Sequence, residues 1–161
     1  LADLSGGGGV RFVGANERDL TGCAVWTAGD GDGGGAPDIL IGAYGLGESG
    51  GAYLVFGEAL ADDFTTAGDG VFRLADMTPD QGISILGLGE ESTVGWSVAD
   101  AGDVDGDGLA DVLIGAWRGD LGASDAGEAY LVTGAALSEA ARYDGVLDIA
   151  DYVPVDDFLF A

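Results

Sequence analysis

The chain has 161 residues, 47% of them hydrophobic, and a formal net charge of −24 with neither lysine nor histidine. So acidic a chain has no basic surface to neutralise phosphates, which excludes nucleic acid and anionic membrane surfaces as partners. The length fits one domain with enough apolar residues for a core, and no apolar run approaches the ~20 residues that membrane insertion of a helix needs.

Taken in chain order, the sequence repeats itself. The matching segments are GCAVWTAGD at 22–30 and GWSVADAGD at 95–103, DILIGAY at 38–44 and DVLIGAW at 111–117, AYLVFG at 52–57 and AYLVTG at 129–134, and DGV at 69–71 and 144–146. Their spacings are 73, 73, 77 and 75 residues. The sequence therefore predicts an N-terminal segment at 1–14 with an orphan strand, whose companion strands are absent. A first repeat follows at 15–87, and a second repeat at 88–161 with a C-terminal strand.

Each repeat is expected to form four short strands. Runs such as ILI at 39–41 and YLV at 130–132 do not alternate apolar with polar residues, so both faces of each sheet are expected to be covered. Small sheets stacked face to face, as in a propeller, provide this cover. Helical turns are expected at 58–66 and 135–142. The predicted strands are 24–27, 39–43, 52–56 and 83–86 in the first repeat, 97–100, 112–116, 129–133 and 158–160 in the second, and 10–13 ahead of both.

The densest cluster of charge is the segment DVDGDGLAD at 103–111. Calcium takes six to eight oxygen ligands, and a short segment gathers that many only by looping around the ion, with Gly106 and Gly108 at the turns. The spacing is similar to half of an EF-hand loop, but Ile114 replaces its bidentate glutamate, so we expect the loop between two strands. The alternative is an Asp/Gly-rich turn without an ion; mutual repulsion of the carboxylates favours the cation. The expected ligands are the side chains of Asp103, Asp105, Asp107 and Asp111 and the carbonyl of Leu109.

The first repeat carries a weaker version of this loop, DGDGGGAPD at 30–38. Gly34 stands where the second repeat has its position-5 aspartate. Three carboxylates and a carbonyl, with water, can still hold an ion less tightly, and the alternative is a degenerate loop held by turn chemistry alone. The expected ligands are Asp30, Asp32, Asp38 and the carbonyl of Ala36.

The second repeat, GWSVADAGDVDGDGLADVLIGA at 95–116, resembles the FG-GAP repeat of integrin α-subunit β-propellers and of bacterial surface proteins. The resemblance implies propeller blades with calcium bound between the first and second strands, and an extracellular or cell-surface location. Two departures stand out. The Phe-Gly pair is replaced at 21–22 and 94–95, and the proline of Gly-Ala-Pro is replaced by Tyr44 and Trp117.

The expected fold is all-β, with two four-stranded antiparallel FG-GAP-type blades and the start of a third repeat. Closed propellers have about four to eight blades, so the blades are expected to be completed by neighbouring repeats or copies. The strand at 10–13 reads as the last strand of a blade whose other strands are absent. One interpretation is blade stacking or strand exchange between copies. Such an assembly is a filament when the successive copies do not close into a ring. The other is an excerpt of a longer propeller.

Enzymatic activity is not expected. Without histidine there is no Ser-His or Cys-His pair, and without lysine there is no Schiff base. The one cysteine, Cys23, aligns with Trp96 in a strand and is expected to be a packed core thiol. A carboxylate pair for glycoside hydrolysis remains open among the many aspartates, but nothing singles one out.

Two functional hypotheses follow. The first is a calcium-binding extracellular structural repeat that assembles with other copies or further repeats, in a surface filament. The second is an adhesin or lectin-like module that binds a glycan or an extracellular protein. An aromatic platform of Trp26, Trp96, Trp117 and Tyr44 fits the second hypothesis, whereas core packing and contact between blades are the alternative role for these side chains.

Overall fold

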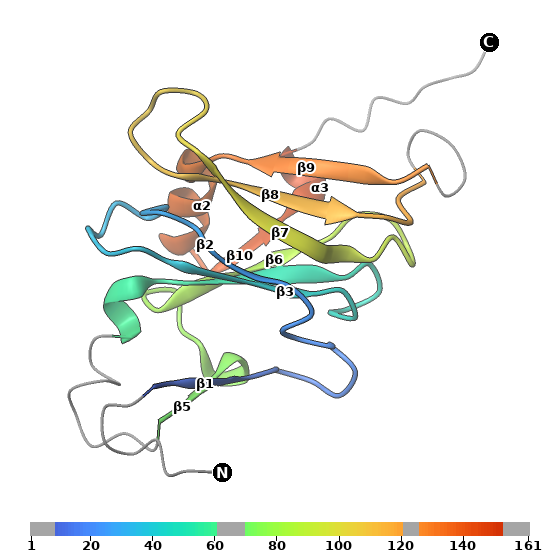
Figure 1. Ribbon diagram of the computed structural model, residues 1–161, viewed down its shortest axis with the longest axis horizontal. Helices are drawn as coiled ribbons and strands as arrows, with labels where there is room; N and C mark the ends of the chain where they lie inside the picture. The colour runs from blue at the N-terminus through green and yellow to red at the C-terminus, as the bar shows by residue number, and fades with distance from the viewer. Residues whose placement is uncertain (1–8, 61–69, 121–125, 153–161) are drawn as a thin grey trace.

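A computed structural model describes residues 9–60, 70–120 and 126–152. The described chain is mostly β and forms three sheets stacked in layers, with the largest sheet in the middle (Figure 1). The all-β class predicted from the sequence is therefore confirmed, and the described residues do not form a closed ring of sheets.

The central sheet has five strands in the order β10-β6-β4-β3-β2. Its four antiparallel strands follow one another as a meander, in register through pairs such as Leu40 with Leu54 and Leu54 with Ile83. They lie where the first repeat predicts strands. The fifth strand comes from the second repeat, pairs parallel with β6, and is not predicted by the sequence. The strands are β2 (Val25–Thr27), β3 (Ile39–Ala43), β4 (Gly51–Val55), β6 (Gly82–Leu86) and β10 (Val146–Asp148).

The three-stranded sheet is built from the second repeat in the order β7-β8-β9. All its pairings are antiparallel, and β7 is longer than predicted. Its pairing with β8 has two register shifts, irregularities of the kind that bend a strand. The predicted fourth strand at 158–160 lies outside the described residues. The strands are β7 (Val94–Gly102), β8 (Asp111–Ala116) and β9 (Glu128–Val132).

The two-stranded sheet pairs β1 (Arg11–Val13) parallel with β5 (Val71–Arg73). This pairing repeats the one between β6 and β10, because Arg11 faces Val71 as Ser84 faces Val146. In its own sheet, β1 therefore has the position that β6 has in the central sheet. After the third strand of each repeat, the chain returns to add a parallel strand to an earlier sheet.

Helical segments are short and lie at the sheet edges. Helix α2 (Gly134–Ala141) is capped by Thr133, whose hydroxyl accepts a hydrogen bond from Ala136 N at 3.4 Å. The turns η1 (Leu74–Asp76) and α3 (Ile149–Tyr152) follow β5 and β10 as repeat equivalents. Among the described residues, no helix combines the length and apolar character needed to cross a membrane.

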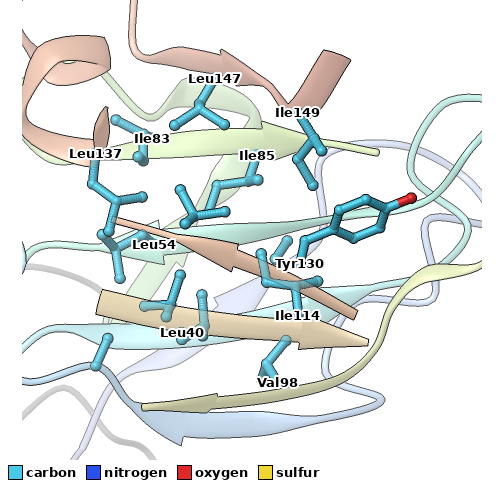
Figure 2. Close-up of a cluster of buried hydrophobic side chains, with 14 of the residues drawn as sticks. Leu40, Leu54, Ile83, Ile85, Val98, Ile114, Tyr130, Leu137, Leu147 and Ile149 are labelled. Carbon is cyan, nitrogen blue, oxygen red and sulfur yellow. The ribbon is translucent and has the colours of Figure 1, made fainter. Parts of the chain in front are cut away.

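The main core lies between the central and three-stranded sheets (Figure 2). Leu40 and Leu54 from the central sheet meet Val98 and Ile114 from the three-stranded sheet, and Leu137 of α2 closes one end. A second core, including Ile41, Tyr53, Val55, Phe72 and Leu74, fills the space between the central sheet and β1–β5. The central sheet is thus covered on both faces, as its unbroken apolar runs predict.

Glycines allow the sheets to approach closely beside Cys23. Gly95 has φ +86°, and a Cβ there would lie 1.8 Å from the carbonyl oxygen of Gly51. The Cys23 thiol donates to the Gly95 carbonyl at 3.2 Å, yet Cys23 is exposed. The prediction of a packed core thiol is therefore wrong, because Cys23 precedes β2, and β2 lies at the open edge of the central sheet.

Candidate metal centre

The acidic loop of the second repeat connects β7 to β8 at one end of the three-stranded sheet. Carboxylate oxygens of Asp103, Asp105 and Asp111 lie within 4.8 Å of one another. Asp111 is fully buried, whereas Asp103 and Asp105 are exposed. The fold therefore brings together three of the side chains that the sequence predicts, from both ends of the nine-residue segment 103–111.

Backbone hydrogen bonds curl the loop around Asp103. Its two carboxylate oxygens accept from Gly106 N at 2.7 Å and Gly108 N at 3.0 Å. Both glycines have positive φ, +81° and +92°, a conformation that costs a glycine little. The loop is therefore closed by its own aspartate, with the other lone pairs of the carboxylate available to an ion.

Asp111 anchors the loop to the body of the sheet. One of its oxygens accepts from Val104 N and the other from Gly134 N, each at 2.8 Å. These bonds join the start of the loop, the first residue of β8 and the start of α2. Asp111 therefore fixes the loop to two other parts of the fold through its two oxygens.

One further predicted carboxylate, Asp107, stands apart from the other three. Asp107 lies outside the group of three, and its carboxylate accepts from Leu109 N at 2.8 Å. Asp105 makes a similar local bond, accepting from Asp107 N at 3.1 Å. All the side-chain donors at this loop are oxygens, the set that calcium and magnesium prefer over softer metals.

The loop of the first repeat has an equivalent of the buried aspartate Asp111, but its carboxylates do not converge. Asp38 is fully buried and accepts from Gly31 N at 2.9 Å and Gly57 N at 3.0 Å. The pKa of Asp38 is raised to about 6, mainly because the carboxyl group is buried. The two hydrogen bonds lower the pKa, whereas the neighbouring carboxylates of Asp32 and Asp30 contribute to raising it. Within described residues 9–60, Asp30, Asp32 and Asp38 do not gather as the second loop does.

Two features of the first loop nevertheless suit a cation. The Oδ1 atom of Asp30 is buried and has no hydrogen-bond partner. The Glu58 carboxylate approaches Gly34 so closely that a Cβ on this glycine would lie 2.8 Å from Glu58 Oε2. Gly34 is the position that lost its aspartate, and Glu58 comes from the helical turn after β4. Glu58 was not predicted from the sequence, in which its repeat equivalent is the uncharged Ala135.

The two loops lie side by side. Ala110 N, in the second loop, donates to the carbonyl oxygen of Asp30 in the first at 3.1 Å. Gly29 faces the Ala110 side chain so closely that a Cβ would lie 2.6 Å from it. The loops therefore form one acidic edge of the molecule and contact each other through their backbones.

The aromatic residues gather at the opposite ends of the strands. Trp96 lies between Tyr44, at 4.9 Å, and Trp117, at 5.8 Å between ring centroids, and joins the two repeats. Trp96 and Trp117 are each about half exposed, and the Arg118 guanidinium lies 5.7 Å from the Trp117 ring. Trp26 is also exposed, on β2. The cluster thus combines contact between sheets with an open surface.

Comparison with known families bears on this part of the chain. Residues 94–132, which span β7, the acidic loop, β8 and β9, match the family model of the FG-GAP repeat. This part of the second repeat is therefore similar to the FG-GAP repeat, a unit of integrin-like β-propellers that is typical of extracellular or surface proteins. No curated protein matches the chain.

Proposed function

We propose that this protein is a non-enzymatic, calcium-binding structural repeat module that acts outside the cell and assembles through its sheets. The observation that carries the proposal is the convergence of Asp103, Asp105 and Asp111 in the loop of an FG-GAP repeat. The absence of lysine and histidine and the net charge of −24 support a structural role in a medium with screening cations.

Calcium would be held by Asp103, Asp105 and Asp111, with Asp107 and the Leu109 carbonyl as further oxygen donors. The ion supplies positive charge that offsets repulsion among the carboxylates. Asp111 transmits this constraint into the fold, because it also binds Val104 N and Gly134 N. The expected consequence is a rigid β7–β8 hairpin, fixed to the start of α2.

The first-repeat loop is the expected second, weaker site, with Asp30, Asp32, Asp38 and the Ala36 carbonyl. The unpartnered Asp30 Oδ1 supports it, and Glu58 offers the charge that Gly34 lacks. Since the loops touch, an ion in one is expected to order the other. Calcium therefore links the two repeats as well as the strands within each.

Metal analysis tests the proposal. After dialysis against micromolar calcium, wild-type protein is expected to retain about one equivalent of tightly bound calcium, and Asp105→Ala is expected to lose it. Asp76→Ala is the matched control, since Asp76 is an exposed aspartate in η1, far in sequence from both loops. Equal calcium content in wild type and Asp105→Ala would overturn the site.

A second candidate function is ligand binding. The half-exposed Trp96 and Trp117, stacked with Tyr44, offer apolar ring faces of the kind that bind sugars. A glycan array compares wild type with Trp117→Ala, and Trp26→Ala is the control from outside the cluster. Binding that is lost only in Trp117→Ala would favour the adhesin or lectin-like role.

A further inference from the structure

The strand counts of the three sheets are complementary. The central sheet has the order β2-β3-β4-β6-β10, in which the first three strands belong to one repeat. The three-stranded sheet β7-β8-β9 is equivalent to the first three of these strands. The two-stranded sheet β1-β5 is equivalent to the last two, with the same parallel pairing and the same register. Together the two smaller sheets contain the parts of one five-stranded sheet.

Within one chain these two parts lie on opposite sides of the central sheet and cannot join (Figure 1). Among the described residues, the edge of β9 away from β8 has no strand partner, nor does the edge of β1 away from β5. In the central sheet the equivalent strands are β4, for β9, and β6, for β1, and there these two edges pair with each other. An exposed strand edge is a template for pairing with another chain.

The apolar surface follows the same pattern. Leu113 and Leu131, on the outer face of the three-stranded sheet, are 40% and 45% exposed. Their repeat equivalents, Leu40 and Leu54, are completely buried because the three-stranded sheet covers them. The outer face of the three-stranded sheet therefore has apolar side chains at the positions that are buried in the central sheet. Among the described residues, however, no further sheet packs over it.

The matching face is on the central sheet. Val98, in β7, is 8% exposed because it packs against the central sheet, whereas its repeat equivalent, Val25 in β2, is 60% exposed. β2 lies at the edge of the central sheet that β1 and β5 leave uncovered. If three strands equivalent to β2-β3-β4 were added to the β1-β5 sheet at the free edge of β1, they would pack over Val25.

We infer that copies of this chain associate head to tail, so that β9 of one copy pairs antiparallel with β1 of the next. The join creates a five-stranded sheet in the order β7-β8-β9-β1-β5, with three strands from one copy and two from the other. Leu113 and Leu131 of the first copy then pack beside Val25 of the second. This inference rests on the proposed assembly and specifies its contact.

The register of the join follows from the central sheet. There Gly51 pairs with Leu86 and Leu54 with Ile83. The repeat spacings of 77 and 73 residues convert these pairs into Glu128 with Val13 and Leu131 with Val10 of the next copy. Because each copy presents one edge of each kind, the contact is heterologous and extends into a filament unless it closes into a ring.

Charge variants on the two faces test the inference by their combination. In calcium, wild-type protein is expected to form multimers whose mass grows with concentration in sedimentation velocity. Leu131→Arg and Val25→Arg are each expected to remain monomeric, while Tyr143→Arg, at a 76% exposed position after α2, assembles as wild type does. An equimolar mixture of Leu131→Arg and Val25→Arg is expected to form dimers only, because one intact face of each kind remains. Dimers in the mixture also show that both variants are folded.

A disulfide tests the register. In a Cys23→Ser background, Val13→Cys with Glu128→Cys is expected to give a ladder of cross-linked multimers on oxidation, whereas Val13→Cys with Tyr143→Cys is not. Multimers of wild type that persist in Leu131→Arg and give no ladder would overturn this contact and leave the proposed assembly standing. A wild type that is monomeric at every concentration would overturn both, and would assign the open edge to residues 153–161 or to further repeats of a longer chain.

Discussion

Asp38 and Asp111, 73 residues apart, make the same two hydrogen bonds in the two repeats. Each accepts from a backbone N–H at the second position of its own loop, Gly31 or Val104. Each also accepts from the glycine that follows its repeat's third strand by two residues, Gly57 or Gly134. The last aspartate of the loop is therefore a structural anchor as well as an expected metal ligand.

This dual role separates two aspartate variants in the second loop. Asp111→Ala leaves the buried N–H of Gly134 and the part-buried N–H of Val104 without their acceptor. It is therefore expected to lower the free energy of unfolding by about 3 kcal/mol even without calcium. Asp105→Ala, an exposed position, is expected to change it by less than about 0.5 kcal/mol in EGTA. Urea unfolding in EGTA measures both. Equal losses in the two variants would contradict the anchoring role of Asp111.

The first loop is expected to use Glu58. Glu58→Gln removes the charge beside Gly34 and is expected to weaken the lower-affinity calcium site roughly tenfold, because affinity follows the charge of the ligand set. The tighter site in the second loop is expected to be unchanged. Isothermal titration with calcium resolves the two steps, and Glu48→Gln, at an exposed position in another turn, is the control. A weaker site unaffected by Glu58→Gln would remove Glu58 from the ligand set.

Acid is expected to stabilise the metal-free protein through Asp38. Its pKa in the fold is about 6, above the usual 3.8, because burial disfavours the charged form. The folded state therefore binds this proton more tightly than the unfolded state. The stabilisation is fully present below pH 3.8 and is lost as the pH rises through about 6. Thermal unfolding in EGTA between about pH 4 and 7 compares wild type with Asp38→Asn, in which this contribution is expected to disappear.

Gly95 is expected to be the least replaceable glycine at the contact between sheets. Gly95→Ala would place a Cβ against the Gly51 backbone, so a loss of about 3 kcal/mol or more is expected. Its repeat equivalent, Gly22, has nearly the same φ, +89°, but a Cβ there would meet nothing within 4 Å. Gly22→Ala is thus a matched control, expected to cost only about 1 kcal/mol of backbone strain. Similar melting temperatures for the two variants would contradict the close approach at Gly95.

The repeat was the strongest guide to the fold. Because the two copies of the repeat share spacing and apolar runs, strands such as β3 and β8 lie where the sequence predicts them. The parallel strands β5 and β10 were missed, since three residues give too little pattern and their partners are far along the chain. Their repeated DGV motif was visible, but it does not specify where a strand pairs.

The candidate site was foreseen in part. The local spacing of acidic residues is enough to gather Asp103, Asp105 and Asp111, because they share one loop. The anchoring by Asp111 needed the position of Gly134, which is set by sheet pairing and not by the loop. Glu58 reaches the first loop from beyond β4 for the same reason. Cys23 was misplaced because its equivalent, Trp96, is itself half exposed.

The most direct measurement is the melting temperature of wild-type protein across a calcium titration, with EGTA as the zero point. An ion that binds only the folded state stabilises it by about 2.7 kcal/mol at a hundred times its dissociation constant. We expect the melting temperature to rise steadily with calcium, and Asp105→Ala to lose most of the rise. A melting temperature that is the same in excess EGTA and in millimolar calcium would contradict the calcium-binding role.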